Sequence, residues 1–551
     1  MPDVSRKCAM SAKNFVVTEQ EQLFLEKQGF PLPTLCIDER HRRRLIRRNE
    51  RAIYKDKCDL TGKDIISLYS PDKLYTVYSQ EAWWGDDWDA KDYGRDFDFD
   101  RSFFEQFYDL QLEVPRLSLL NDKAINSEYC NITTQNKNCY LVFGGDINED
   151  CLCSVFCFNC KDSCDLYWVN RSELSYDSID CADCYNIKYC QNTYNCRDSV
   201  FLFNCRRLAN CFGCVNLSDK QFYIFNKPYS EAEYVKKLAE FKLNTWSGVQ
   251  KMKEEFFEFK LQFPNRYARL INSEDCSGDN ISNGKNCANC FDIEGPAEDV
   301  KDLLISGVKI KDMLSCNHVW LNCELCYELT GSIYTYNCAF SSFIWNSNNV
   351  FYSDMCVNNC SHLFGCSNLK KAEYCILNRQ YSKEDYFALK DKIIEYMKKT
   401  GEWGEFFPMK HSPWAYNETV AQDYTPISKE TALQEGLAWH DEEMKQVGTG
   451  FEIPDAIEDV EESIVDKPLV CIKSGRPYSI NKQELKLYKR LGIPIPQYAP
   501  ETRNQLRFLA RNPQHVWSRK CDKCGIDVQS SFSTERSEQV YCEKCYLSEI
   551  N

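Results

Sequence analysis

The sequence predicts a mainly β protein in which two cysteine-rich, β-solenoid-like blocks lie between two small α+β modules. Three observations lead to this prediction: short strand-like runs beside Asn-Cys and Asp-Cys pairs, a duplication within the centre of the chain, and a second duplication that relates its two ends. The 551 residues are enough for several domains, and 43% hydrophobic and 27% charged residues are ordinary for a folded chain.

These patterns divide the chain into six segments. We expect a module over 1–83, an acidic Trp- and Asp-rich connector over 84–119, and a first β-repeat block with a terminal helix over 120–265. A second such block over 266–407 and an acidic linker over 408–466 precede the last module, over 467–551.

The two ends of the chain are copies of each other. Residues 8–83 align with residues 471–546 without a gap, at a constant offset of 463. In the first copy, Thr18 and Glu21 form a capping box and Gly29 ends the helix that follows. The second copy repeats this pattern with Asn481, Glu484 and Gly492. We expect a second, basic helix to begin near Arg40 and, in the other copy, near Arg503.

The central region contains short runs of aromatic and β-branched residues, such as 138–143 and 199–203, separated by Asn, Asp, Ser and Gly. Their spacing is irregular, at roughly 10–20 residues. The segment 212–217 recurs as 364–369, and each block ends in an amphipathic pattern, near 230–242 and 382–398. Aligned small residues between short strands predict coils that stack into a β-solenoid.

Twenty-five of the 33 cysteines lie in these two blocks, and three interpretations of them remain open. They can be reduced thiols that pack inside the coils, because cysteine is small and often buried. They can instead bind metal through C-x-x-C pairs, or form disulfides. The pairs in question are Cys157/Cys160, Cys181/Cys184, Cys211/Cys214, Cys287/Cys290 and Cys323/Cys326.

The strongest metal pattern stands near the C-terminus. Two C-x-x-C knuckles, Cys521/Cys524 and Cys542/Cys545, are separated by 17 residues and supply four soft ligands for one tetrahedral ion. We expect one structural zinc ion there, with no ligand position left for catalytic water.

The N-terminal copy has lost this ligand set. Cys58 keeps its place, but Thr61, Ser79 and Ala82 stand where the other three thiols stand. We therefore expect this copy to bind no zinc there and to be held by packing, with the Trp-rich segment 83–88 as a partner.

The stretch from Cys8 through Ser11, Glu21, Gly29 and Cys36 to Glu39 and Arg40 resembles a family of probable zinc-ribbon or treble-clef domains. That family carries two C-x-x-C knuckles around a Glu-containing helix. Here only Cys8 and Cys36 stand at ligand positions, with Ser11 and Glu39 in place of the others; the second copy has Cys471, Ser474, Ala499 and Thr502. The whole chain also resembles a group of uncharacterised cysteine-rich bacterial proteins, most distinctly at residues 412–421, which implies architecture only.

The net charge of −15 conceals basic ends, over 1–57 and 467–551, and acidic segments, over 84–113 and 421–466. The basic helices can contact a protein partner or the phosphates of a nucleic acid, or they can dock on acidic parts of the same chain. The residues concerned are Arg40, Arg42, Arg43, Arg44, Arg47, Arg48, Arg503, Arg507 and Arg511.

No pattern of a catalytic centre stands out. The six histidines are scattered, and the sequence has no phosphate-binding glycine motif. Residues 96–100 alternate Asp and Phe as an edge strand would, which can also place three carboxylates on one face. No run of about 18 apolar residues and no secretory signal is visible, so we expect a cytoplasmic protein without membrane contact.

Together these patterns predict a non-catalytic, zinc-containing binding or scaffold protein that uses a β-solenoid platform and basic terminal modules to contact a protein or nucleic-acid partner. The alternative is a thiol-based metal-binding or redox protein, or an enzyme built on a β-solenoid.

Overall fold

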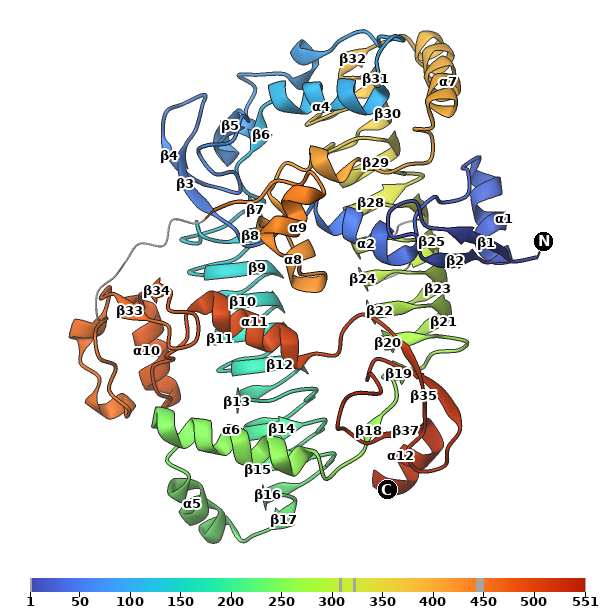
Figure 1. Cartoon of the computed structure of the whole chain (residues 1–551). Helices are drawn as coiled ribbons and strands as arrows, with labels where there is room; N and C mark the ends of the chain where they lie inside the picture. Colours follow the sequence, from blue (N-terminus) through green and yellow to red (C-terminus); the bar gives the residue numbers. More distant parts are fainter. Residues whose placement is uncertain (1, 307–309, 321–323, 442–449, 551) are drawn as a thin grey trace.

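The computed structural model describes residues 2–306, 310–320, 324–441 and 450–550. Two ladders of short, mainly parallel strands lie side by side and run in opposite directions (Figure 1). The first runs from β7 (Asn121–Asp122) to β17 (Lys227–Pro228), and the second from β19 (Leu270–Ile271) to β32 (Arg379–Gln380). The mainly β prediction with a central β-solenoid is confirmed.

The strands between these limits are short. The first ladder contains β8 (Asn131–Thr134), β9 (Tyr140–Asp146), β10 (Glu149–Phe158), β11 (Lys161–Asn170), β12 (Tyr176–Ala182), β13 (Tyr185–Lys188), β14 (Arg197–Phe203), β15 (Ala209–Val215) and β16 (Gln221–Ile224). The second contains β20 (Gly278–Ser282), β21 (Gly284–Ala288), β22 (Cys290–Ile293), β23 (Ala297–Lys301), β24 (Leu304–Ser306), β25 (Ile310–Leu314), β26 (Asn317–Trp320), β27 (Glu324–Tyr327), β28 (Thr330–Tyr336), β29 (Ser342–Phe351), β30 (Ser361–Phe364) and β31 (Glu373–Ile376).

Each coil of the first ladder takes twelve residues, since Glu149 pairs with Lys161 and Cys164 with Tyr176. Along these coils every third residue has a positive φ, as in the series Asp150, Cys153, Phe156, Asn159 and Asp162. A coil therefore has four corners joined by three-residue sides. This period lies within the range of roughly 10–20 residues expected from the sequence, but the spacing is more regular than expected. The second ladder departs from 12 by one residue in places, as between Leu270 and Ile281 and between Phe291 and Leu304.

The residue after each corner points into the coil. From Cys130 to Cys214 these positions hold Cys, Ser, Thr, Asn, Gly, Val, Leu and Ile, and all of them are buried. A thiol or hydroxyl there donates to the carbonyl two residues earlier; Cys139 Sγ lies 3.4 Å from the Lys137 oxygen and Ser154 Oγ lies 2.8 Å from that of Leu152. Small side chains fit this narrow interior and satisfy its carbonyl groups.

The Asn-Cys pairs in the sequence follow from the same geometry. The Asn is a corner, and Asn tolerates the left-handed backbone better than most residues. Its amide often continues to the corner one coil further on: Asn186 Nδ2 donates to Asp198 at 2.8 Å and Asn204 Nδ2 to Asn216 at 2.7 Å. A C-x-x-C pair occupies two successive inward positions on different sides of a coil, which explains its frequency without a metal. Cys323 lies outside the described residues.

Asn195 tests the corner geometry, because it is exposed and has a φ of 55°. Asn195→Val should lower the free energy of unfolding by about 1–2 kcal/mol, since a β-branched residue disfavours the left-handed region. Arg197→Val, two residues away on an exposed part of the same coil without positive φ, is the matched control and should change stability by less than about 0.5 kcal/mol. Equal effects in chemical denaturation would contradict the corner assignment.

The two terminal modules have the same element order at the 463-residue offset. The first contains β1 (Val4–Lys7), β2 (Asn14–Val17), α1 (Glu19–Gln28), α2 (Ile37–Leu45), β3 (Tyr54–Lys57), β4 (Asp64–Ser67), β5 (Val77–Tyr78) and α3 (Gln80–Trp84). The second contains β33 (Leu469–Val470), β34 (Pro477–Tyr478), α10 (Lys482–Leu491), α11 (Pro500–Ala510), β35 (Trp517–Lys520), β36 (Asp527–Ser530), β37 (Val540–Tyr541) and α12 (Glu543–Ile550). The predicted caps are confirmed at Thr18 and Asn481, as are the left-handed ends at Gly29 and Gly492.

The modules dock crosswise on the ladders (Figure 1). In the N-terminal module, Phe30 packs on Tyr327 and Phe340 of the second ladder. In the C-terminal module, Tyr488 packs on Tyr176 of the first ladder. The last strand of each module pairs with a short strand beside the other ladder. β5 pairs with β6 (Arg116–Leu117), just before the first ladder, and β37 pairs with β18 (Asn265–Arg266), just before the second. Each module therefore bridges both ladders.

The remaining helices cover the ladder ends and edges. They are α4 (Phe103–Glu113), α5 (Glu231–Glu240), α6 (Trp246–Lys260), α7 (Lys383–Thr400), α8 (Ala421–Tyr424) and α9 (Lys429–Gln434). Much of the segment expected as an acidic linker is packed: Tyr416, Val420 and Ala432 form a buried cluster with Leu45 of α2. The segment 96–100 is a loop and not the expected edge strand. Phe97 packs from this loop against Phe103.

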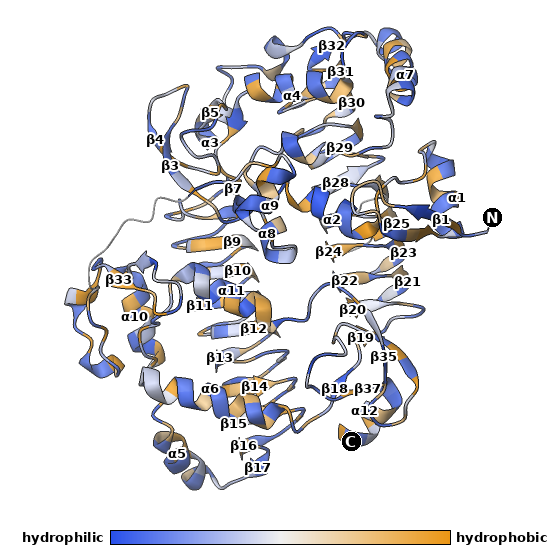
Figure 2. Cartoon of the chain, in the orientation of Figure 1, coloured by the Kyte–Doolittle hydropathy of each residue, from blue (hydrophilic) through white to orange (hydrophobic). Residues whose placement is uncertain are grey.

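Hydrophobic and hydrophilic residues alternate at short intervals through the ladders and helices (Figure 2). Within the described ranges, no helix combines the length and the apolar character needed to cross a membrane.

Candidate metal centre and the adjoining cavity

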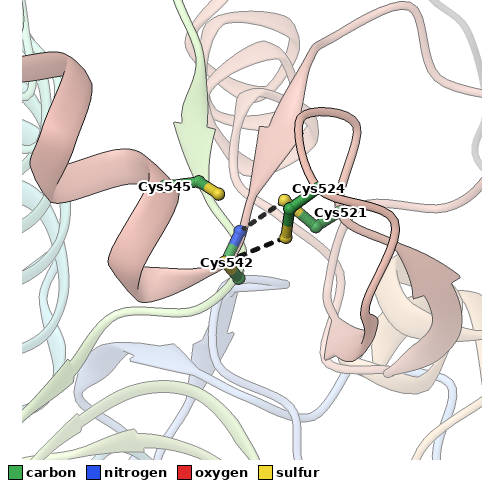
Figure 3. Close-up of side chains that lie close together, drawn as sticks. All are labelled: Cys521, Cys524, Cys542 and Cys545. Carbon is green, nitrogen blue, oxygen red and sulfur yellow. Dashed lines mark hydrogen bonds between the residues drawn. The ribbon is translucent and has the colours of Figure 1, made fainter.

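The four predicted metal ligands lie together at the C-terminal end of the chain (Figure 3). The β35–β36 hairpin presents Cys521 and Cys524, while the end of β37 and the first turn of α12 present Cys542 and Cys545. The sulfur atoms all lie within 4.8 Å of one another, and Cys524 Sγ is 3.7 Å from Cys542 Sγ. Zn–S bonds of about 2.3 Å in a tetrahedron require S–S separations of about 3.8 Å, so this cluster fits an ion of that kind.

Electrostatics around the cluster favour a bound cation. Burial raises the pKa of Cys521, but the backbone amides of Cys542, Cys524 and Lys523 outweigh it and lower that pKa to about 6. Loss of solvent and the neighbouring thiols raise the pKa of Cys545 to about 12, because a further negative charge is unfavourable there. A divalent cation removes this conflict by neutralising several thiolates at once.

The N-terminal copy keeps the same local fold without the ligands. The amide of Ser79 donates to Cys58 Sγ at 3.2 Å, just as that of Cys542 donates to Cys521 Sγ at 3.2 Å. Cys58 belongs to a buried cluster with Val77 and Trp83, so this thiol is packed among apolar side chains.

The other cysteine knuckles of the modules have also lost ligands. Ser11 Oγ lies 3.6 Å from Cys36 Sγ, and Cys8 joins Cys36 in a small buried cluster. Glu39 is instead paired with Arg42 at 3.4 Å. In the second copy, Cys471 Sγ donates to Thr502 at 3.5 Å. Among the described residues, neither group of side chains gathers a further set of three metal ligands.

The nine arginines expected to face a partner are placed inside the molecule, which corrects that expectation. In the N-terminal module, Arg43 pairs with Glu328 at 3.0 Å and Arg47 with Asp354 at 3.5 Å. Desolvation of buried charge is costly unless it is paired, and these carboxylates supply the pairing. The side chains of Arg40, Arg42, Arg43, Arg44, Arg47, Arg48, Arg503, Arg507 and Arg511 are at most 10% exposed. They are therefore unavailable to phosphates of a nucleic acid, and they dock on this chain's own acidic groups.

We call the contact of each module with its ladder a dock: that of α1 and α2 with the second ladder, and that of α10 and α11 with the first. The two docks have the same arrangement of ion pairs. Arg40 pairs with Glu21 at 3.2 Å, and at the 463-residue offset Arg503 pairs with Glu484 at 3.4 Å. Each arginine also meets a corner aspartate of the ladder it docks on: Asp302 at 3.8 Å from Arg40, and Asp165 at 2.6 Å from Arg503. The arginine thus joins a helix of its module to a solenoid coil.

Arg503→Met should lower the free energy of unfolding by about 3–5 kcal/mol, because it removes the arginine partner of the buried Glu484 and leaves Asp165 with Arg507 alone. Arg490→Met, which breaks a half-exposed pair with Asp162 in the same module, should cost less than about 1 kcal/mol. Chemical denaturation compares them, and a small effect of both would show that the docks are weak.

A cavity of about 350 Å³ adjoins the metal centre. It lies between the first ladder, α6, the segment that enters the second ladder, and the C-terminal module. The residue after the last predicted ligand, Tyr546 in α12, lines it and is hydrogen-bonded to Asn204 at 2.5 Å and to Asn216 at 3.2 Å. An ion bound by the four thiols would therefore fix the helix that closes one side of this cavity.

The cavity lining is rich in cations, which are Arg206, Lys260, Arg266, Arg269 and Arg536; the acidic lining residues are Asp180, Asp279 and Glu538. Arg269 lies 3.6 Å from Asp180, and Arg536 pairs with Glu538. Within the described part of the chain, Arg206 and Lys260 have no carboxylate at ion-pair distance; Arg206 stacks on Tyr194 and the Lys260 Nζ lies 4.6 Å from the Phe203 ring centre. The lining thus carries two positive charges in excess.

Burial lowers the pKa of Lys260 to about 8. An anion that enters the cavity would restore the solvation that the amine has lost, and it would find Arg206 as a second donor. No sequence pattern predicted this site, because its residues come from segments spread between Asp180 and Ile550 and none belongs to a recognisable motif.

No protein-family model, curated protein or solved structure matches this chain.

Proposed function

We propose that the chain is a non-catalytic binding protein that holds a small anionic ligand, one bearing a phosphate or carboxylate group, in the cavity beside a structural zinc site. The observation that carries this proposal is the pair of cations, Arg206 and Lys260, that face the cavity without a carboxylate partner among the described residues. Arg206 is exposed and Lys260 is half-buried, and both can form charge-assisted hydrogen bonds to an anion. A cavity of about 350 Å³ suits a small organic molecule.

The identity of the metal as zinc, and the assignment of the C-terminal module to a zinc-ribbon or treble-clef class, belong to this proposal. Four thiols at tetrahedral spacing support zinc, which prefers such sites and acts there in folding. A cytoplasmic location is proposed with them: inward cysteines that donate to backbone carbonyls need to stay reduced.

Metal analysis tests the zinc site. The purified chain should contain about one zinc ion, and Cys521→Ser should lose most of it and expose α12 to faster amide hydrogen exchange. Cys58→Ser, the same position in the N-terminal copy, is the control and should keep the ion. Because the thiolates must be deprotonated and the pKa of Cys521 is about 6, zinc affinity should fall as the pH drops below 6. Equal zinc in both variants would contradict the site.

Calorimetric titration with inorganic pyrophosphate and with citrate tests the cavity. Lys260→Met and Arg206→Gln should each weaken binding of at least one of these anions about tenfold or more, the usual effect of losing a charge-assisted hydrogen bond. Lys251→Met on the exposed part of α6 and Arg207→Gln, in an exposed pair with Asp219, are matched controls. Failure of both anions to bind, or equal losses in the controls, would contradict the proposal.

The same titration has a predicted pH dependence. Lys260 is positive below its pKa of about 8 and neutral above it, so anion affinity should fall as the pH rises through that region. In Lys260→Met this decrease should disappear, while Lys251→Met should retain it. A pH dependence that survives in Lys260→Met would show that another group controls binding.

A further inference from the structure

Two cysteines of the first ladder depart from the inward pattern. Among the described cysteines of that ladder, Cys153 and Cys164 stand at other positions: Cys153 is a corner and Cys164 directly precedes the corner Asp165. The inward cysteines of the ladder form one buried cluster along the coil axis, whereas these two belong to a different cluster that contains residues of α10. Their sulfurs therefore face the dock of the C-terminal module.

The two thiols lie next to each other on neighbouring coils. Their sulfur atoms are within 4.8 Å, and Leu152, beside Cys153, is the register partner of Cys164. Both are free thiols in the structure. A sulfur–sulfur bond, about 2.05 Å long, would require the two side chains to rotate toward each other.

Polar groups of the module surround this pair. Arg503 Nη2 donates to Cys153 Sγ at 3.6 Å, and Glu484 Oε1 lies 3.9 Å from the same sulfur. Cys164 Sγ lies 3.7 Å from the hydroxyl of Tyr488, which in turn donates to Glu484 at 2.8 Å. A cationic donor beside a sulfur favours the thiolate form, which is the nucleophile in disulfide exchange.

Among the described residues, the equivalent place in the N-terminal dock holds an ion pair instead of two thiols. Lys301, which precedes the corner Asp302 as Cys164 precedes Asp165, pairs with Glu21 at 2.6 Å. An ordinary ion pair thus suffices at one dock, and the other has two sulfurs in that region. Packing alone therefore does not require the two thiols at the C-terminal dock.

A second cavity, also of about 350 Å³, reaches one of the two thiols. Cys153 lines it together with Leu141, Phe143, Tyr54 and Asn504, and is 5% exposed, whereas Cys164 is fully buried and absent from the lining. A small molecule in this cavity would therefore contact Cys153 before Cys164.

We propose that Cys153 and Cys164 are a dithiol site that reacts reversibly with small disulfides, and that its oxidation loosens the C-terminal module on the first ladder. In the first step the Cys153 sulfur attacks one sulfur of the reagent and breaks its S–S bond; the thiolate that leaves takes the Cys153 proton. In the second step Cys164 attacks the Cys153 sulfur and releases the second small thiol, which takes the Cys164 proton. The protein loses two hydrogens, and the reagent becomes two thiols.

Oxidation changes the dock because both sulfurs would turn toward each other. Cys153 would then leave the hydrogen bond of Arg503, and Cys164 that of Tyr488. A metal at this place is less favourable, because Asp165, the third nearby ligand atom, is already bound by Arg503 and Arg507 at 2.6 and 3.0 Å.

Peptide mapping by mass spectrometry on the native, zinc-loaded full chain tests the proposal, with bis(2-hydroxyethyl) disulfide as the reagent. We expect a disulfide between Cys153 and Cys164 to form at least about tenfold faster than modification of the inward cysteines Cys151 and Cys157, and a mild dithiol reductant to reverse it. Amide exchange in α10 and α11 should become faster in the oxidised chain.

Two variants separate the two steps. Cys164→Ser should stop at a mixed disulfide on Cys153. Cys151→Ser changes an inward cysteine of β10, the strand that contains Cys153, and should react as the unmodified chain does. The proposal is overturned if the pair does not react, if the inward thiols react as fast, if α10 and α11 exchange no faster after oxidation, or if a metal ion held by the pair prevents oxidation. The mapping of the unmodified chain decides this even if a variant does not fold, and it is independent of anion binding.

Discussion

The left-handed backbone at every third residue is the constraint on which the rest of the structure depends. It fixes a coil of four three-residue sides, and this coil leaves one inward residue per side and a narrow interior. Each left-handed non-glycine residue is unfavourable by about 1–2 kcal/mol, so the coil is stable only if the ladder hydrogen bonds and the packed interior outweigh that cost. The abundance of Asn and Asp at corners and of Cys and Ser inside is a direct consequence.

The modules dock on the outer faces of the coils through aromatic contacts, such as that of Tyr488 with Tyr176, and through buried charge. Corner aspartates such as Asp165 and Asp302 project from the coils, and Arg503 and Arg40 bind them from the two modules. Because each module docks on one ladder by its helices and joins the other by its last strand, the two ladders are held side by side. The metal centre and the cavity lie where the C-terminal module makes its second contact.

The sequence predicted the features that depend on neighbouring residues. The capping box at Asn481 and the spacing of Cys521 and Cys524 are local, so their outcome could be foreseen. The coil length could not, because an inward position accepts Cys, Ser, Val or Leu alike, which hides the period. The burial of Arg44 was also hidden, since a run of arginines resembles a solvated surface until its partner Glu328, far along the chain, is placed beside it.

The cavity shows the same limit more strongly, since Lys260 and Arg536 meet only after both ladders and a module are assembled.

The coil geometry remains the central claim, and counting alkylated thiols by intact mass tests it most directly. In the native, zinc-loaded chain the inward cysteines between residues 130 and 214 should resist N-ethylmaleimide, and all of them should react after denaturation without reductant. Rapid labelling of these cysteines in the native chain, or failure to label them after denaturation, would contradict the account.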